Sequence, residues 1–75
     1  MTQSGTEHIG AVIRELRLER GVRQAELARA VGCHPKTVAK IEAGKRNPSA
    51  VLRRRIARVL DIPVGELREP NGVAA

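Results

Sequence analysis

The side chains best suited to chemistry in this sequence are lysines at helical spacing near the middle of the chain. Lys36 and Lys40 are four residues apart, and the apolar residues Val38 and Ile41 alternate with them. In a helix, this spacing turns the apolar pair toward a core and the lysines away from it. The residues expected on the outward face, or at the entrance of the helix, are Pro35, Lys36, Thr37, Ala39, Lys40 and His34. Such a face offers hydrogen-bond donors to an anionic or polar ligand, which is the chemistry of binding.

The positive charge of the chain is concentrated around and after these lysines. The 75 residues have a net charge of +6, from 14 Lys and Arg against 8 Asp and Glu. Residues 36–58 contain eight of the basic residues and a single acid, Glu42, which gives a local net charge of +7. This distribution is typical of a surface that binds phosphates. The alternative is a solvated basic face that has no ligand.

The elements that must position the lysines are two short amphipathic helices, residues 24–31 and 35–43, in which apolar residues recur at steps of three and four. Gly32 lies between them, where a sharp turn favours a residue free to adopt positive φ. Pro35 suits the first turn of the second helix, and Ala28 is small enough for the two helices to cross closely. Two helices joined this tightly predict a helix-turn-helix, which presents its second helix to the major groove of DNA.

The flanking sequence predicts further helices over residues 8–20, 50–60 and 64–67, with Ser49 as the N-cap of the second of these. The residues expected to face inward are Ile9, Val12 or Ile13, Leu16, Leu52, Ile56, Val59 and Leu60. The core must be aliphatic because the chain has no Phe, Tyr or Trp. The predicted fold is all-α, a compact bundle of four to five short helices over residues 8–68. Residues 1–7 are expected to be a disordered N-terminal tail and residues 69–75 a flexible C-terminal tail.

The order of these segments resembles the XRE family, the Cro and phage-repressor type of helix-turn-helix domain with a lambda-repressor-like fold. The resemblance extends from about Ile9 to Leu67 and rests on the segments RELR, QAELA and IEAGKRNPS. A helix-turn-helix pattern alone gives frequent false matches, and these flanking segments make the resemblance specific. It implies a DNA-binding transcriptional regulator that is not an enzyme and needs no cofactor.

The resemblance implies base contacts from the outward face of the second motif helix. Members of the family read bases from positions that match Pro35, Lys36 and Lys40. Proline cannot donate a hydrogen bond, so the two lysines are expected to read base edges, with a preference for guanine. Thr37 or Ala39 is expected to contact a thymine methyl group. The alternative is that both lysines contact phosphate or are only solvated.

The resemblance also implies phosphate contacts from Arg23, Gln24, His34, Lys45, Arg46 and Asn47. Gln24 matches a glutamine that holds a phosphate at a helix N-terminus, where free N–H groups and the helix dipole favour an anion. Without a ligand it would simply begin the helix. Arg23 replaces a usual Ser or Thr N-cap and adds a cation beside the same phosphate. Asn47 suits bracing of the loop equally well, and one or two of the three consecutive arginines at 53–55 can reach phosphate.

Two further expectations concern assembly. Arg17 and Glu42 match an ion pair by which the family fixes the angle of the reading helix. The apolar residues Ile62, Val64 and Leu67 could close the core or supply a dimer patch. A homodimer would place two reading helices about 34 Å apart on an inverted repeat of double-stranded DNA. The expected function is therefore sequence-specific regulation of transcription, most simply repression.

The competing hypothesis is an antitoxin-type or other protein-interaction module with secondary DNA binding. Antitoxins of this family usually carry a toxin-binding extension. We expect none here, since only eight residues follow Leu67. A protein partner is thus allowed by the sequence but not indicated.

The remaining residues predict no second site. Cys33 occupies a turn position that favours a half-buried thiol, and one cysteine with two histidines is too few for a typical metal site. Glu15, Glu19 and Glu26 are expected to be surface charges paired with arginines. No apolar run approaches the ~20 residues of a membrane span, and a single cysteine suits a reducing compartment. We therefore expect a cytoplasmic protein of bacterial, phage or plasmid origin.

Overall fold

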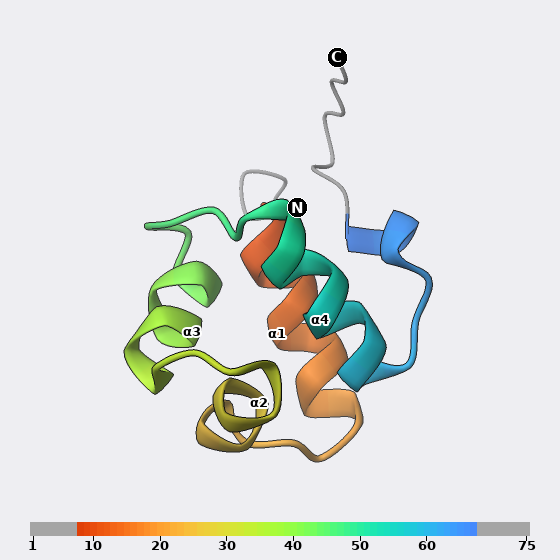
Figure 1. Cartoon of the computed structure of the whole chain (residues 1–75), viewed down its shortest axis with the longest axis horizontal. Coiled ribbons are helices and arrows are strands. Elements are labelled where there is room, and N and C mark those ends of the chain that lie inside the picture. Colours follow the sequence, from red (N-terminus) through yellow and green to blue (C-terminus); the bar gives the residue numbers. More distant parts are fainter. Residues whose placement is uncertain (1–7, 68–75) are drawn as a thin grey trace, which may run out of the picture.

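Regular structure in the computed structural model, which describes residues 8–67, consists of helices, and no strand is present in that range (Figure 1). The elements are α1 (Ile9–Glu19), α2 (Gln24–Val31), α3 (Pro35–Glu42), α4 (Ala50–Leu60) and the 3₁₀ helix η2 (Val64–Leu67). The all-α prediction is confirmed, and the expected helix bounds are met to within one residue. Both predicted tails, residues 1–7 and 69–75, lie outside the described residues, as does residue 68.

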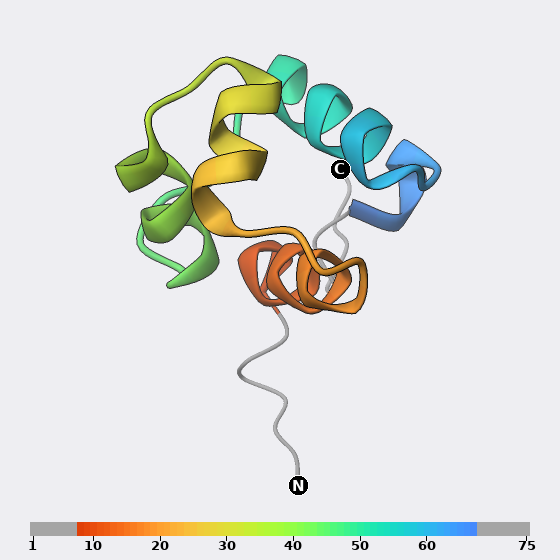
Figure 2. The ribbon, with the colours of Figure 1, turned by 90° about the horizontal axis from the view of Figure 1, so that it is seen from below.

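The four α-helices surround one aliphatic core. α1 packs against α3, α4 and η2, whereas α2 packs against α3 and α4. Figure 2 shows α2 across the molecule from α1, with α3 and α4 on either side. The buried side chains come from all five elements: Ile9, Ile13, Leu27, Ala28, Val31, Val38, Ile41, Ile56, Ala57, Leu60 and Leu67. Burial of each large aliphatic side chain contributes about 1.5–3 kcal/mol relative to exposure, so this core is the main source of stability.

Local sequence signals set where the helices begin and end. Ser49 caps α4, because its Oγ accepts from a backbone N–H of the first turn at 3.1 Å, and His8 Nδ1 caps α1 at the same distance. Gly32 ends α2 with φ at 81°, and Pro35 occupies the first position of α3. The tight turn between α2 and α3 therefore follows from residue types that the sequence displays.

α1 packs directly against the last turn of α3 at Gly10. A Cβ atom at Gly10 would overlap the backbone carbonyl of Ile41. The sequence pattern led us to assign a close helix crossing to Ala28, which is fully buried, but not to Gly10. A glycine inside a helical pattern lowers helix stability by about 1 kcal/mol relative to alanine, so its presence there was an available signal of close packing.

The prediction that Val59 faces the core is wrong, because 37% of its surface is exposed. The buried residues of α4 are Ile56, Ala57 and Leu60. At about 100° per residue, Val59 lies roughly 100° from the centre of this buried arc. Ala57, which we had not expected to face inward, is buried instead.

Leu67 closes the core and cannot belong to a dimer patch. Its side chain is fully buried, and η2 packs against both α1 and α4. Ile62 is half-buried, and Val64 is 46% exposed. Of the three apolar residues that could have formed the patch, only Val64 and part of Ile62 remain accessible.

Candidate nucleic-acid interface

The outer face of α3 carries two lysines directly opposite the core. Val38 and Ile41 are buried, whereas Lys36 and Lys40 are exposed. At about 100° per residue, the two lysines lie roughly 180° from the buried side of the helix. α3 lies at one edge of the molecule (Figure 1), so this face is open to a large ligand.

The other residues of the expected reading face differ in how exposed their side chains are. Pro35 is exposed at the first position of α3, while Thr37 and Ala39 are half-buried. The last two lie about 100° to either side of Val38, which brings them to the borders of the helix with its neighbours. We had expected both to face outward, and the structure narrows the open face to Pro35, Lys36 and Lys40.

A buried ion pair joins α3 to α1. Arg17 Nε donates to Glu42 Oε2 at 2.7 Å, and Arg17 Nη2 donates to Glu42 Oε1 at 3.0 Å. The third donor, Nη1, binds the Val22 carbonyl at 2.7 Å. Only 6% of each of the two charged residues is exposed. Two parallel N–H···O bonds fix the orientation of both groups, and thereby the last turn of α3 relative to α1.

Gln24 connects the start of α2 to the same carboxylate. Its Nε2 donates to Glu42 Oε1 at 3.0 Å, so Glu42 accepts side-chain hydrogen bonds from both α1 and α2. We had expected Gln24 either to bind a phosphate or to begin the helix without a partner, and this bond was not predicted. The bond uses one of two amide protons, which leaves the other N–H beside the free backbone N–H groups at the start of α2.

His34 caps α3, and the cap determines which ring nitrogen can reach a ligand. His34 Nδ1 accepts from the Lys36 backbone N–H at 3.0 Å. Because Nδ1 is an acceptor, the proton of the neutral ring must be on Nε2. The residue is exposed, so this N–H is available to an anion at the N-terminal end of α3.

Glu26 caps the start of α2, whereas we had expected it to be a surface charge paired with an arginine. The Arg23 backbone N–H donates to Glu26 Oε1 at 2.8 Å, which is one half of a capping box. The Arg23 side chain makes no capping hydrogen bond and is exposed. The N-cap residue of α2 therefore carries an exposed cationic side chain.

The loop after α3 presents the exposed residues Lys45, Arg46 and Asn47. Gly44 has φ at 81°, and the Lys45 N–H donates to the Lys40 carbonyl at 2.9 Å. This bond ties the loop to the last turn of α3. Cations from the helix and from the loop are consequently presented at the same end of α3.

Cys33 lies half-buried in the turn between α2 and α3. Burial raises the pKa of its thiol, and the positive charge of Arg46 opposes this effect. The raised pKa keeps the thiol protonated at neutral pH, as is typical of a packing residue rather than a reactive cysteine.

Two arginines bind the C-terminal ends of helices. Arg55 Nη1 donates to the Val31 carbonyl of α2 at 3.3 Å, and Arg20 Nε donates to the Leu60 carbonyl of α4. A cation at a helix C-terminus is favoured by the helix dipole. We had expected one or two of the arginines at residues 53–55 to reach phosphate. The sequence contained no local signal for these two bonds, which span 24 and 40 residues.

Among residues 8–67, no three His, Cys, Asp or Glu side chains are grouped so that they could hold a metal ion. None of the helices described here has the length and apolarity needed to cross a membrane. The polar groups that the fold does bring together are the donors and cations around α3.

Comparison with known sequences identifies the same motif. Residues 13–67 match the family model described as Helix-turn-helix. An HTH-type transcriptional regulator from Archaeoglobus fulgidus is 44% identical over 55 residues, which cover 73% of this chain and 79% of that protein. Another, from Methanothermobacter thermautotrophicus, is 47% identical over 49 residues, covering 65% of this chain and 71% of that protein.

Solved structures with the same fold include two bacterial regulators. The restriction-modification controller protein C.AhdI from Aeromonas hydrophila has a TM-score of 0.79 and 35% identity, covering 88% of this chain and 100% of that chain. The master regulator for biofilm formation SinR, in complex with DNA, has a TM-score of 0.74 and 33% identity, covering 79% of this chain and 95% of that chain. The chain therefore belongs to the XRE type of the helix-turn-helix family, a family of DNA-binding transcriptional regulators rather than enzymes.

Proposed function

We propose that the chain binds double-stranded DNA as a homodimer and represses transcription at an inverted-repeat operator. The observation that carries the proposal is the position of Lys36 and Lys40. They stand opposite the core on α3, whose last turn is held by a buried ion pair to α1. A helix held this firmly keeps its side chains at a fixed distance from base edges, which sequence-specific reading requires.

Base reading is assigned to the exposed face of α3. Lys36 and Lys40 donate to the O6 and N7 acceptors of guanine in the major groove. Thr37 and Ala39, at the edges of this face, are placed for methyl contacts with thymine. Pro35 shapes the approach of the helix without forming a hydrogen bond to a base.

Phosphate contacts are assigned to groups at both ends of α3 and at the start of α2. At the N-terminal end these are His34 Nε2, the second amide proton of Gln24 and the Arg23 guanidinium. At the C-terminal end they are the side chains of Lys45, Arg46 and Asn47. Cations and donors on both sides of a helix suit the two phosphate backbones that border a major groove, and they set register without reading sequence.

The homodimer is proposed because a single α3 spans only a few base pairs. Two copies related by a two-fold axis would place their reading helices about 34 Å apart, on one face of the duplex. The 3₁₀ helix η2, which begins at the exposed Val64, lies on the side of the molecule away from α3 (Figure 1). Pairing through that side would leave both reading helices outermost. Similarity to a restriction-modification controller protein and to DNA-bound SinR supports a regulatory role, and a bound dimer can repress by blocking polymerase.

The proposal is tested by selecting bound sequences from a random duplex pool at physiological salt with the purified protein. We expect an enriched inverted repeat whose half-sites are about one helical turn apart. Lys36→Ala should relax the preference at one base position by about 1–3 kcal/mol. Arg46→Ala should weaken all sequences alike. Failure to enrich any sequence, or identical selectivity profiles for the two variants, would overturn the division into reading and anchoring residues.

Salt dependence gives an independent check on the anchoring residues. The logarithm of the binding constant should fall linearly with the logarithm of salt concentration, with a slope of about −0.9 for each phosphate contacted. Arg46→Ala should therefore make the slope about 1.8 less negative for a dimer that loses two contacts. A slope that does not change would remove Arg46 from the contact set.

A further inference from the structure

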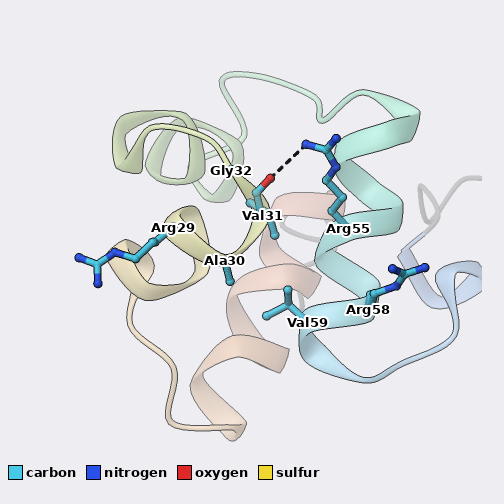
Figure 3. A pocket seen from close by; sticks show the side chains of 7 residues that line it. All are labelled: Arg29, Ala30, Val31, Gly32, Arg55, Arg58 and Val59. Carbon is cyan, nitrogen blue, oxygen red and sulfur yellow. Dashed lines mark hydrogen bonds between the residues drawn. The ribbon is translucent and has the colours of Figure 1, made fainter.

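A shallow groove of about 370 Å³ runs between the second half of α2 and the outer side of α4. The residues around it include Arg29, Ala30, Val31, Arg55, Arg58 and Val59 (Figure 3). No residue of α3 lines it. The groove is thus separate from the face assigned to base reading.

The floor of this groove is apolar and accessible. Val59 is 37% exposed, and Ala30 of α2 is exposed across from it. Figure 3 shows the Val59 side chain at the centre of the groove, with Ala30 on the facing helix. Burial of this exposed aliphatic surface by an apolar side chain of a partner would be favourable, because it removes apolar area from water.

The rim of the groove is positively charged. Arg29, Arg55 and Arg58 are among its lining residues, and none of the lining residues is acidic. Figure 3 shows Arg29 and Arg58 extending outward on opposite sides of the groove, away from Val59. Within residues 8–67, none of the three arginines has a carboxylate within ion-pair distance. Arg55 is held in place by its bond to the Val31 carbonyl, which orders the guanidinium while leaving most of its donors free (Figure 3).

We infer that this groove docks an acidic amphipathic segment of a partner protein. Its aliphatic side chains would cover Val59 and Ala30, and its carboxylates would pair with Arg55 and, at the outer edges of the groove, with Arg29 and Arg58. The charge of the rim selects an acidic occupant, and the apolar floor selects one with aliphatic side chains. A DNA backbone matches the charge but offers no aliphatic group to bury Val59, so a protein segment fits the groove better.

The test is titration of the isotopically labelled full chain with a blocked acidic peptide, followed by NMR. A peptide of about 15 residues, with leucines on one face and glutamates on the other, is long enough to form a helix. A control peptide carries glutamine in place of each glutamate. We expect amide shifts at Ala30, Gly32 and Val59, and much weaker binding of the control peptide.

Matched variants on α4 locate the binding site. Arg58→Gln removes a rim charge and should weaken the acidic peptide by about fivefold, in line with an exposed ion pair. Arg54→Gln makes the same change one turn away on the same helix, outside the groove, and should stay within about twofold of the parent. Val59→Ser should weaken binding more than Val51→Ser, which alters an exposed valine of α4 that does not line the groove. All four positions are exposed, so folding is checked by helical circular dichroism.

Five outcomes would overturn the inference. Equal binding of the acidic and glutamine peptides would show that the carboxylates do not contribute to binding. Equal losses for Arg54→Gln and Arg58→Gln would show only diffuse charge attraction. Peptide shifts centred on Lys36 and Lys40 would place the peptide on the DNA-binding face. A loss of duplex affinity in Arg58→Gln equal to that in Arg46→Gln would make the groove a phosphate contact. Self-association of the chain alone, reversed by Arg58→Gln, would make the occupant a second copy.

Discussion

Removal of the Glu42 carboxylate should destabilise the fold more than any surface change. In Glu42→Ala the Arg17 guanidinium stays buried and loses two hydrogen bonds, of 2.7 and 3.0 Å, while Gln24 loses its acceptor at 3.0 Å. Breaking one side of a buried ion pair typically removes about 3–5 kcal/mol. A 75-residue chain has about 4–11 kcal/mol of stability in total, so the loss is at least about a quarter of it.

The measurement is thermal unfolding followed by far-ultraviolet circular dichroism. The chain has no Phe, Tyr or Trp, so helical ellipticity rather than intrinsic fluorescence must report the transition. In a domain of this size, 1 kcal/mol corresponds to a shift in Tm of about 4–8 °C. The loss of 3 kcal/mol or more predicts a Tm at least about 12 °C below that of the parent.

Two controls separate the ion pair from a general effect of losing a glutamate. Glu15→Ala removes an exposed carboxylate from α1 and should change stability by no more than about 0.5 kcal/mol. Replacing Arg17 and Glu42 together with methionine removes both buried charges and should unfold at a higher temperature than Glu42→Ala. If Glu42→Ala melts within about 4 °C of the parent, the reasoning from burial is refuted.

Three further predictions follow from the fold. Gly10→Ala would place a Cβ against the Ile41 carbonyl. It should lower the free energy of unfolding by about 1–3 kcal/mol, although alanine has the better helix propensity. A stabilised variant would contradict the α1–α3 packing. His34→Ala should remove about 0.5–2 kcal/mol by deleting the cap of α3, whereas His34→Asn should retain most of it; equal melting of the two variants would exclude the cap as the cause. Cys33 should react with iodoacetamide at pH 8 more slowly in the folded protein than in urea, because burial raises the pKa of its thiol; equal rates would show that the thiol is not protected.

The helices and the reading face were predictable because they depend on local order in the sequence. Periodicity of apolar residues gave all five elements, and Gly32 with Pro35 located the turn of the motif. Because Val38 and Ile41 were expected to face the core, Lys36 was expected on the outer face of α3, and it is exposed in the structure. These inferences need only the geometry of a helix.

Contacts between distant parts of the chain were predictable only where the family resemblance supplied them. That resemblance paired Arg17 with Glu42, whereas nothing in the sequence indicated that Gln24 would join them. Val59 was misplaced because a single turn of α4 holds several apolar residues, and the packing of α1, α2 and η2 against α4 decides which of them are buried. Leu67 had two open roles, and the packing of η2 on α1 and α4 decided between them.

The distribution of positive charge shows most clearly what the fold adds to the sequence. Residues 36–58 form one basic stretch, which we interpreted as a single phosphate-binding surface. The structure divides it: Lys36 and Lys40 lie on the outer face of α3, whereas Arg55 and Arg58 line the groove against α2. Arg29, from outside that stretch, completes the rim of the groove. Charge along a chain therefore favours an anionic ligand, but only the packing of the helices separates the face that we assign to DNA from the groove that we assign to an acidic protein.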